Sequence, residues 1–271
     1  TEFTPDSGRY HLYVSLACPW AHRTLIYRSL KNLEDHISCC VVNPYMLENG
    51  WTFDESYPGT TKDHLFSKKY LYQIYLKANP NYSGRVTVPV LWDKKNQTIV
   101  SNESSEIIRM FNKSFNELTG NQLDFYPKNF QKKIDEINDY TYHNINNGVY
   151  KVGFSTNQKV YEEEFNKLFN ALDNLETMLT NNQHLLGDEL LECDLRLFPT
   201  LLRFDPVYVG HFKCNKKRIA DYPQLHRYLT SISANPQIKK TINLEHIKTH
   251  YYGSHPTINP TGIIPLGPLD N

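Results

Sequence analysis

The chain has 271 residues, of which 39% are hydrophobic and 21% are charged, values within the normal range for a globular protein of one or two domains. Lysine plus arginine and aspartate plus glutamate each number 29, so the balanced charge does not favour nucleic acid or an anionic membrane as a partner. No apolar stretch is long enough to cross a bilayer, and we expect neither a signal peptide nor a membrane span.

Five cysteines are scattered along the chain: Cys18, Cys39, Cys40, Cys193 and Cys214. An odd, scattered set is not a disulfide framework and fits a reducing compartment, so we expect a cytoplasmic protein. We expect Cys39, Cys40 and Cys193 to be core residues and Cys214, inside the polar run KCNKK, to be exposed. The 19 tyrosines suit either a pocket for an aromatic ligand or contacts between helices.

The first elements form a β-α-β unit. Residues 10–16 and 37–43 are predicted strands, and apolar residues recur at helical spacing from Pro19 to Leu33 between them. Pro19 suits the first helical turn, where its missing N–H costs nothing. A β-α-β unit implies parallel strands.

An insertion and a second group of elements follow. We predict a loop at 44–66, a short helix at 68–78, a strand hairpin from 85–93 and 97–101, and a helix capped by Asn102–Glu103–Ser104. The order β-α-β, insertion, β-β-α is the thioredoxin-like arrangement. Pro89, inside a predicted strand, supports the same fold, because thioredoxin-like folds place a cis-proline facing the active-site thiol. The alternative is an ordinary proline in an edge strand.

The pattern becomes helical after residue 115. A linker is predicted at 116–127, helices near 130–141, 165–179, 194–204 and 225–232, and an irregular tail at 253–271. We therefore expect an α/β thioredoxin-like domain at 1–115 and an all-α domain with a C-terminal tail at 128–271.

Cys18 lies where the first strand meets the first helix, in SLACPWAHRT. Unpaired N–H groups and the positive end of the helix dipole stabilise a thiolate there, and the thiolate is the nucleophile. A buried packing cysteine is the alternative. Three residues on stands Ala21 rather than a second cysteine, so Cys18 cannot close its own disulfide. An external thiol must resolve any mixed disulfide, and glutathione is the natural candidate.

Glutathione requires partners for its charged ends and its backbone. Glu103 and Ser104, at a helix start, offer an acceptor for the ammonium group and donors for the carboxylate, although a simple helix cap also fits. The Val88 backbone before Pro89 offers strand-like pairing. Arg85 offers a charge for a carboxylate. His22, four residues after Cys18, either tunes the thiolate or has a capping or packing role.

Several motifs resemble one family. RYHLYVSLACPWAHRT, GRVTVPVLWD, NESSEIIRMF, NNGVYKVGF, RFDPVYVGHFKCN and the HYYGSHPTINPTGI segment are similar to the glutathionyl-hydroquinone reductases, the Xi class of glutathione transferases, from about residue 9 to 268. The resemblance implies a thioredoxin-like domain joined to a helical one, a homodimer, and reduction of glutathionyl-hydroquinones by glutathione.

The resemblance also implies roles for individual residues. Cys18 would be the nucleophile. The residues that resemble the glutathione site are Trp51, Arg85, Val88, Glu103 and Ser104. The tyrosines that resemble the lining of the quinone site are Tyr150, Tyr208 and Tyr251, although Tyr252 is adjacent to the last of them.

The sequence departs from glutathione transferases at one capping box, Leu191–Glu192–Cys193–Asp194, because Leu191 has no side-chain oxygen. The eleven histidines form no metal-ligand cluster, so we expect no metal. Two other functions remain open: an Omega-like thioltransferase or dehydroascorbate reductase, and a non-catalytic glutathione-binding scaffold.

Overall fold

The structure, a computed structural model, describes residues 2–268. Its described residues divide into two compact units. The first unit reaches Leu123 and also includes Lys240–His250, and the second comprises Asp124–Lys239 and the residues from Tyr251 onward. The sequence prediction, with domains at 1–115 and 128–271, groups the segment Lys240–His250 with the helical domain instead.

The first unit is built on a four-stranded mixed sheet with the order β2-β1-β3-β4. Its strands are β1 (Tyr10–Val14), β2 (Ile37–Val41), β3 (Val90–Asp93) and β4 (Thr98–Ser101). β1 is parallel to β2 and antiparallel to β3, and β3 is antiparallel to β4. All five residues of β1 are buried, so this strand is the centre of the unit's core. The predicted thioredoxin-like topology is confirmed.

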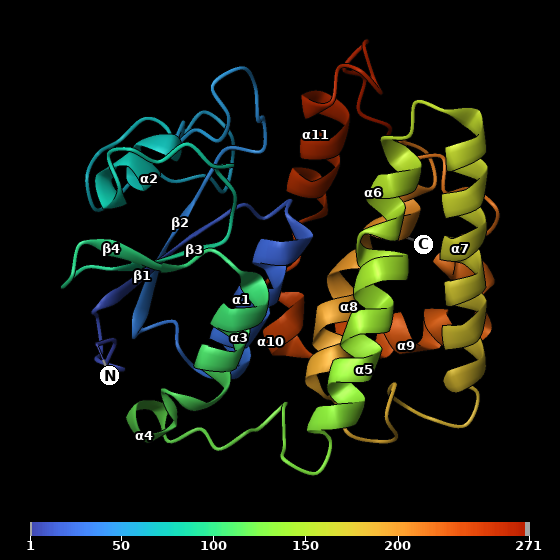
Figure 1. Ribbon diagram of the computed structural model, residues 1–271, viewed down its shortest axis with the longest axis horizontal. Coiled ribbons are helices and arrows are strands. Elements are labelled where there is room, and N and C mark those ends of the chain that lie inside the picture. Colours follow the sequence, from blue (N-terminus) through green and yellow to red (C-terminus); the bar gives the residue numbers. More distant parts are fainter. Residues whose placement is uncertain (1, 269–271) are drawn as a thin grey trace. The chain divides into compact units, whose positions relative to one another are not determined.

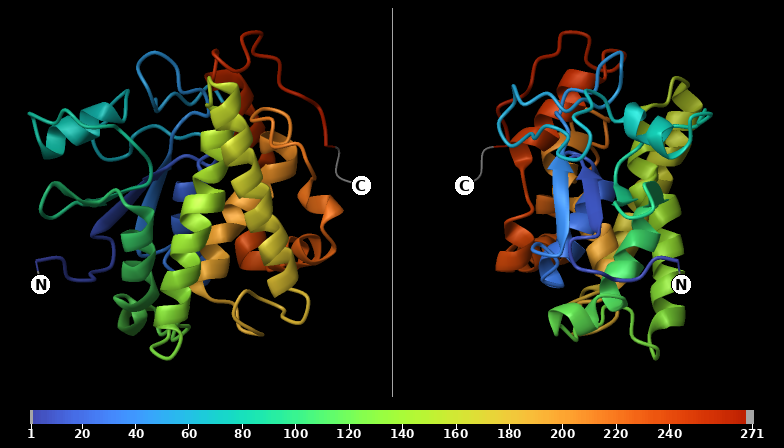
Figure 2. Two further views of the ribbon diagram at one scale, coloured as in Figure 1. Left: turned by 45° about the vertical axis from the view of Figure 1, so that its right-hand side comes forward. Right: turned by 90° about the vertical axis from the view of Figure 1, so that its left-hand side faces the viewer.

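Four helices accompany the sheet: α1 (Pro19–Leu30), α2 (Tyr72–Ala78), α3 (Ser104–Lys113) and the short α4 (Asn116–Thr119). α1 and α3 pack side by side (Figure 1). The connection after β2 runs as loops before it reaches α2 (Figure 2). The long loop predicted there is confirmed, whereas α4 lies inside the segment predicted as a linker.

The two ends of α1 have clear causes. Pro19 occupies the first helical position, and Cys18 is the N-cap with an extended backbone (φ −74°, ψ 124°). At the other end, the buried Lys31 donates from its Nζ to the carbonyl oxygens of Asn121 and Leu123. The ammonium group therefore ties the end of α1 to the segment that follows α4.

The second unit is helical. Its elements are α5 (Gln131–Thr141), the π-helix η1 (Tyr142–Asn146), α6 (Gly148–Gly153), α7 (Gln158–Met178), α8 (Glu192–Arg203), the π-helix η2 (Phe204–Tyr208), the 3₁₀-helix η3 (Ile219–Asp221), α9 (Pro223–Ser233) and α10 (Pro236–Lys239). α6 and α7 run side by side (Figure 2). α11 (Leu244–Ser254) begins in the first unit and ends in the second. The four predicted helices are confirmed, whereas α6, α10 and α11 were not predicted.

The C-terminal tail, where it is described, agrees with the prediction from residue 255 onward, whereas residues 253 and 254, predicted as tail, are the last residues of α11. Residues 255–268 contain no helix or strand, and residues 269–271 of the predicted tail lie outside the described residues. No helix within residues 2–268 combines the length and the apolar character that a membrane span requires.

Two π-helical turns interrupt the helical unit. The N–H of Asn147 donates to the carbonyl of Tyr142 at 3.0 Å, and the N–H of Val209 donates to the carbonyl of Phe204 at 2.9 Å. Each bond spans five residues instead of the four of an α-helix. The wide turn η1 ends just before α6, which carries Tyr150, and η2 ends at Tyr208 itself.

The capping box of α8 is half present. The Asp194 carboxylate accepts from the Leu191 N–H at 2.9 Å, whereas the hydrocarbon side chain of Leu191 offers no acceptor to the Asp194 N–H, which donates to the Leu191 carbonyl at 3.1 Å instead. Asp194 also accepts from the Leu185 N–H and the Tyr228 hydroxyl, each at 2.9 Å. Burial raises the pKa of Asp194, and the two backbone donors oppose that rise.

Of two expectations about single residues, one is confirmed in position only and the other is wrong. Glu103 is the N-cap of α3, but its exposed side chain makes no capping bond; the Ser101 hydroxyl instead accepts from the Glu103 N–H at 3.0 Å. Cys214 is fully buried rather than exposed, and its N–H donates to the Tyr208 carbonyl at 2.9 Å, which fixes its backbone next to the end of η2. Cys40 and Cys193 are buried as expected, and Cys39 is half-buried.

Candidate active site

Cys18 occupies the junction of strand and helix that the sequence indicated. Its side chain is partly exposed, and its Sγ lies 3.6 Å from the carbonyl oxygen of Val88. The Val88–Pro89 peptide bond is cis, as predicted. The thiol and the Val88 backbone, which are 70 residues apart in the sequence, therefore meet at one place in the first unit.

His22 is one turn along α1 from this thiol. Its ring is buried, and its Nε2 forms a hydrogen bond of 2.8 Å with the Thr241 hydroxyl. Of the roles left open for His22, this bond favours packing, since it fixes the imidazole within the first unit.

The start of α3 presents Glu103 and Ser104 together. The backbone N–H groups of Ser104 and Ser105 have no acceptor among residues 2–268, so they remain available to an anion at the helix N-terminus. The Ser104 hydroxyl accepts from Nη1 of Arg23 at 3.4 Å. Arg23 also lies over the Trp20 ring, with its guanidinium 4.5 Å from the ring centroid.

Arg23 is a residue that sequence reasoning missed. It is buried, and it projects from α1 toward the start of α3. Its position, one turn after Pro19 on the helix capped by Cys18, could have indicated a role at the site. A single arginine in an amphipathic helix is, however, usually interpreted as a solvent-exposed residue.

Trp51 and Arg85 are the two remaining candidates for the glutathione site. No hydrogen bond joins either side chain to Cys18 or to the start of α3 within residues 2–268. Arg85 is exposed, and its guanidinium has no ion-pair partner in this part of the chain. Trp51 is buried, and its ring stacks on the imidazole of His250, with the ring centroids 4.8 Å apart and the planes at 26°.

The three candidate tyrosines meet in the second unit. The hydroxyls of Tyr150 and Tyr251 lie 2.5 Å apart, and those of Tyr208 and Tyr251 lie 3.1 Å apart. Tyr251 is therefore the central member of this tyrosine cluster (Tyr150, Tyr208 and Tyr251). The adjacent Tyr252 instead donates to the Pro206 carbonyl at 3.4 Å.

Two members of the tyrosine cluster, Tyr208 and Tyr251, stay protonated at neutral pH. Burial raises the pKa of Tyr208 and of Tyr251 well above the usual value of 10. Tyr251 adds to the rise at Tyr208 and Tyr150 adds to the rise at Tyr251, whereas the hydrogen bond with Tyr150 lowers the pKa of Tyr208 and that with Tyr208 lowers the pKa of Tyr251. The charge of the fully buried Arg203 opposes the rise at both hydroxyls. The cluster can therefore donate protons or hydrogen bonds to a ligand oxygen, with a cation nearby that favours negative charge.

Aromatic and imidazole rings surround these tyrosines. The Phe212 ring is parallel to that of Tyr208, with centroids 5.4 Å apart. His211 and His255 are hydrogen-bonded to each other at 3.0 Å, and burial lowers the pKa of each imidazole to about 4. The sequence motif GHFKCN contains His211 and Phe212, but nothing in its spacing predicted this pairing.

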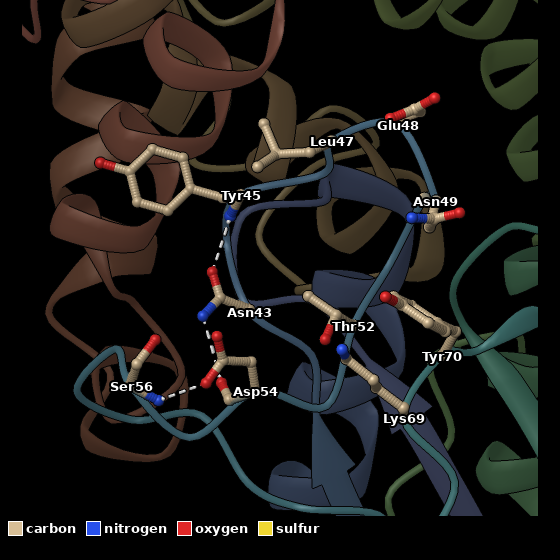
Figure 3. Close-up of a pocket in the computed structure, with 11 residues that line it drawn as sticks. Asn43, Tyr45, Leu47, Glu48, Asn49, Thr52, Asp54, Ser56, Lys69 and Tyr70 are labelled. Atoms are coloured by element: carbon tan, nitrogen blue, oxygen red, sulfur yellow. Dashed lines mark hydrogen bonds between the residues drawn. The ribbon is translucent and has the colours of Figure 1, made fainter.

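A pocket of about 450 Å³ opens in the loop segment of the first unit (Figure 3). Its wall is organised by Asn43, whose amide donates to the Asp54 carbonyl at 3.1 Å and accepts from the Tyr45 N–H at 3.0 Å. Gly50 and Thr52 line it, on either side of Trp51 in the chain. None of the predicted site residues lines this pocket.

Within residues 2–268, no set of three or more His, Cys, Asp and Glu side chains is arranged to hold a metal ion.

Comparison with known families places both units. The N-terminal domain family of glutathione S-transferases matches residues 17–114, and the C-terminal domain family matches residues 158–231. The predicted fold class, a thioredoxin-like α/β domain with an all-α domain, is confirmed as the glutathione transferase fold.

Individual relatives agree along nearly the whole chain. The chain is 60% identical to glutathionyl-hydroquinone reductase YqjG of Escherichia coli, over 98% of this chain and 81% of that protein. It is 54% identical to glutathionyl-hydroquinone reductase PcpF of Sphingobium chlorophenolicum, over 98% of this chain and 85% of that protein.

Solved structures give the same answer. A glutathione-bound structure of YqjG matches with a TM-score of 0.97 at 59% identity, over 98% of this chain and 87% of that one. The glutathione S-transferase Xi of Phanerochaete chrysosporium also matches with a TM-score of 0.97, at 54% identity over 99% of this chain and 93% of that one. This chain belongs to the glutathione transferase family, and within it to the glutathionyl-hydroquinone reductases of the Xi class.

Proposed function

We propose that the protein reduces glutathionyl-hydroquinones to hydroquinones with glutathione, through a mixed disulfide between Cys18 and glutathione. The supporting observation is a partly exposed thiol at the N-cap of α1, beside the Val88 carbonyl. The relatives named glutathionyl-hydroquinone reductases support the same reaction.

The reaction has two halves. In the first, the Cys18 thiolate attacks the sulfur of the conjugate, a sulfur–sulfur bond forms, and the bond between that sulfur and the aromatic carbon breaks. The electron pair stays on the carbon, which takes up a proton. In the second, the thiolate of another glutathione attacks the mixed disulfide, which releases oxidised glutathione and restores Cys18. Glutathione is thus oxidised, and the aromatic carbon is reduced.

The glutathione site in this proposal consists of Trp51, Arg85, Val88, Glu103 and Ser104. Two N–H groups without acceptors at the start of α3 support binding of the γ-glutamyl carboxylate, and Glu103 would accept from the neighbouring ammonium. The charge of Arg85 suits the glycine carboxylate, since this guanidinium is exposed. The Val88 backbone would pair with the cysteinyl residue.

The aromatic half of the conjugate would bind at the tyrosine cluster. Three hydroxyls that meet within hydrogen-bond distance can donate to the hydroquinone oxygens. The raised pKa values of Tyr208 and Tyr251 keep both phenols protonated at neutral pH, which suits hydrogen-bond donation to the hydroquinone oxygens. The proposal also assigns to this cluster the delivery of a proton to the aromatic carbon.

The proposal extends to the setting of the enzyme. It includes a thioredoxin-like glutathione-binding domain at 1–115, a helical substrate domain at 128–271, a homodimer, and glutathione and aromatic glutathione conjugates as ligands. It includes no metal, nucleic acid or membrane as a partner. Five cysteines without disulfides support work in the cytoplasm.

Replacement of one sulfur atom tests the reaction. Cys18→Ser should abolish release of hydroquinone from a glutathionyl-hydroquinone and prevent a glutathione adduct that mass spectrometry detects on the native protein. Cys39→Ser is a matched control, because burial raises the pKa of the Cys39 thiol to about 12 and keeps it unreactive. An unchanged reductase rate in Cys18→Ser would refute the thiol mechanism.

Two further rates separate the alternative functions. A protein that reduces a small mixed disulfide of glutathione much faster than a glutathionyl-hydroquinone would be an Omega-like thioltransferase. A protein that binds glutathione but reduces neither substrate would be a scaffold.

A further inference from the structure

His250 lies directly against Trp51 within the first unit. The centroids of the imidazole and indole rings are 4.8 Å apart, and the planes are 26° from parallel. Both side chains are nearly closed to solvent, with exposed fractions of 7% for His250 and 6% for Trp51. A flat ring thus covers one face of an indole that the proposed function assigns to the glutathione site.

The imidazole is fixed by a second contact. Its Nδ1 lies 2.8 Å from the carbonyl oxygen of Pro44. A carbonyl only accepts, so Nδ1 carries the proton and donates it. Pro44 and Trp51 belong to the same loop, and His250 therefore holds this loop at its backbone and at its indole ring.

Two other residues of α11, His246 and Thr249, contact the loop segment at a place away from Trp51. The Nε2 of His246 donates to the Pro58 carbonyl at 2.6 Å, and the Tyr57 hydroxyl is 2.7 Å from that of Thr249. His246 and His250 are four residues apart and share one face of the helix. His246 and His250 therefore make the same kind of contact with a loop carbonyl, but only His250 also stacks on the Trp51 indole.

We propose that His250 is a positioning residue that holds the Trp51 indole in the orientation which receives the glutathionyl group. The inference rests on the proposed function, because it takes Trp51 as part of the glutathione site. An indole without its stacked partner would sample other rotamers and would lose binding energy in ordering on the ligand. A favourable ring pair changes an equilibrium by roughly 2- to 10-fold, which sets the expected size of the effect.

Substitutions at position 250 separate the ring from the hydrogen bond. His250→Phe keeps a flat ring against Trp51 and removes the donor to Pro44. His250→Asn keeps an amide donor near the place of Nδ1 and removes the ring. His246→Asn is the matched control, since the shorter side chain loses the Pro58 contact and leaves the ring pair intact.

The measurement is the dissociation constant of S-methylglutathione, which has the peptide of glutathione but no free thiol, together with kcat and KM for glutathione. For His250→Asn we expect the dissociation constant and KM to rise by roughly 3- to 10-fold while kcat stays within about 2-fold. His250→Phe and His246→Asn should remain within about 2-fold of the unchanged protein. His250→Gln replaces His250→Asn if the latter does not fold, as judged by circular dichroism.

Two outcomes would overturn the inference: an unchanged dissociation constant in His250→Asn, or an equal rise in His246→Asn, which would assign the effect to loop anchoring. Trp51→Leu distinguishes this failure from that of the proposed function. If Trp51→Leu weakens binding of S-methylglutathione and His250→Asn does not, only the positioning role fails. If the Trp51→Leu protein also binds S-methylglutathione with unchanged affinity, Trp51 does not belong to the glutathione site.

Discussion

Removal of one oxygen atom from the centre of the tyrosine cluster should separate the two halves of the reaction. Tyr251→Phe keeps the ring, which packs edge-on against Tyr208 and Phe212 with centroids 5.5 and 5.7 Å away. It removes the hydroxyl that bonds to Tyr150 at 2.5 Å and to Tyr208 at 3.1 Å. The substitution therefore tests the hydrogen bonds rather than the packing.

The expected effects of Tyr251→Phe on stability and on rate depend on the role of the hydroxyl. The loss of bonds to buried partners costs about 1–3 kcal/mol of stability, which leaves a protein of ordinary stability folded. If the cluster delivers the proton to the aromatic carbon, release of hydroquinone should slow by about 10²- to 10⁴-fold. If the ring only stacks on the substrate, the loss should stay below about 10-fold, because the ring remains.

The assay follows each half-reaction by stopped flow. Formation of hydroquinone and of the Cys18 mixed disulfide should slow in Tyr251→Phe. Reduction of the preformed mixed disulfide by glutathione should keep its rate, since that exchange places no proton on carbon. Tyr252→Phe is the control, because its hydroxyl contacts the Pro206 carbonyl rather than the cluster. Equal slowing of both half-reactions, or of neither, would refute the proposed role.

Three effects on stability follow from the same structure. Asp194→Ala leaves three buried donors without their acceptor and should lower the free energy of unfolding in urea by about 3–5 kcal/mol; an unchanged midpoint would contradict this. Because burial lowers the pKa of His211 and His255 to about 4, their contribution is present above pH 6.5 and is lost as the pH falls toward 4. His255→Gln should flatten this acid loss, and an equally steep loss would refute the assignment. Because burial raises the pKa of Tyr208 and Tyr251 well above 10, stability should fall above about pH 10, and less so in Tyr251→Phe.

The fold near Cys18 could be predicted from the sequence because several local patterns there indicate the same structure. An alternating strand, a cysteine, a proline at the first helical position and a second strand imply a β-α-β unit, and the observed sheet has that topology. Pro89 could be interpreted because a proline inside a strand needs a special backbone.

α11 was not predicted because hydrophobic periodicity does not describe it. The inward residues of LEHIKTHYYGS include His246 and His250, which are buried with hydrogen bonds to loop carbonyls. Imidazoles count as polar in a periodicity search, so the helix resembled a loop. For the same reason, the contact between His250 and Trp51 could not be predicted from the sequence.

The tyrosine cluster lay beyond any local pattern. Tyr150, Tyr208 and Tyr251 are separated by 58 and 43 residues, and only the family resemblance suggested a common site. Their hydroxyl contacts depend on how separate helices pack, which no window of sequence describes. Arg203, whose charge acts on two of these hydroxyls, gave no signal at all for the same reason.

Because of the π-helical turn η2, the direction of the Tyr208 side chain depends on the number of residues before it as well as on their identity. Each residue of an α-helix turns the chain by about 100° and advances it by about 1.5 Å. The additional residue of the wide turn Phe204–Tyr208 therefore rotates the end of this segment relative to α8. Deletion of a single residue within the turn would retain a helix and the tyrosine, yet it would turn the phenol by a quarter of a circle away from Tyr251. In the evolution of this site, insertion and deletion are thus as consequential as replacement.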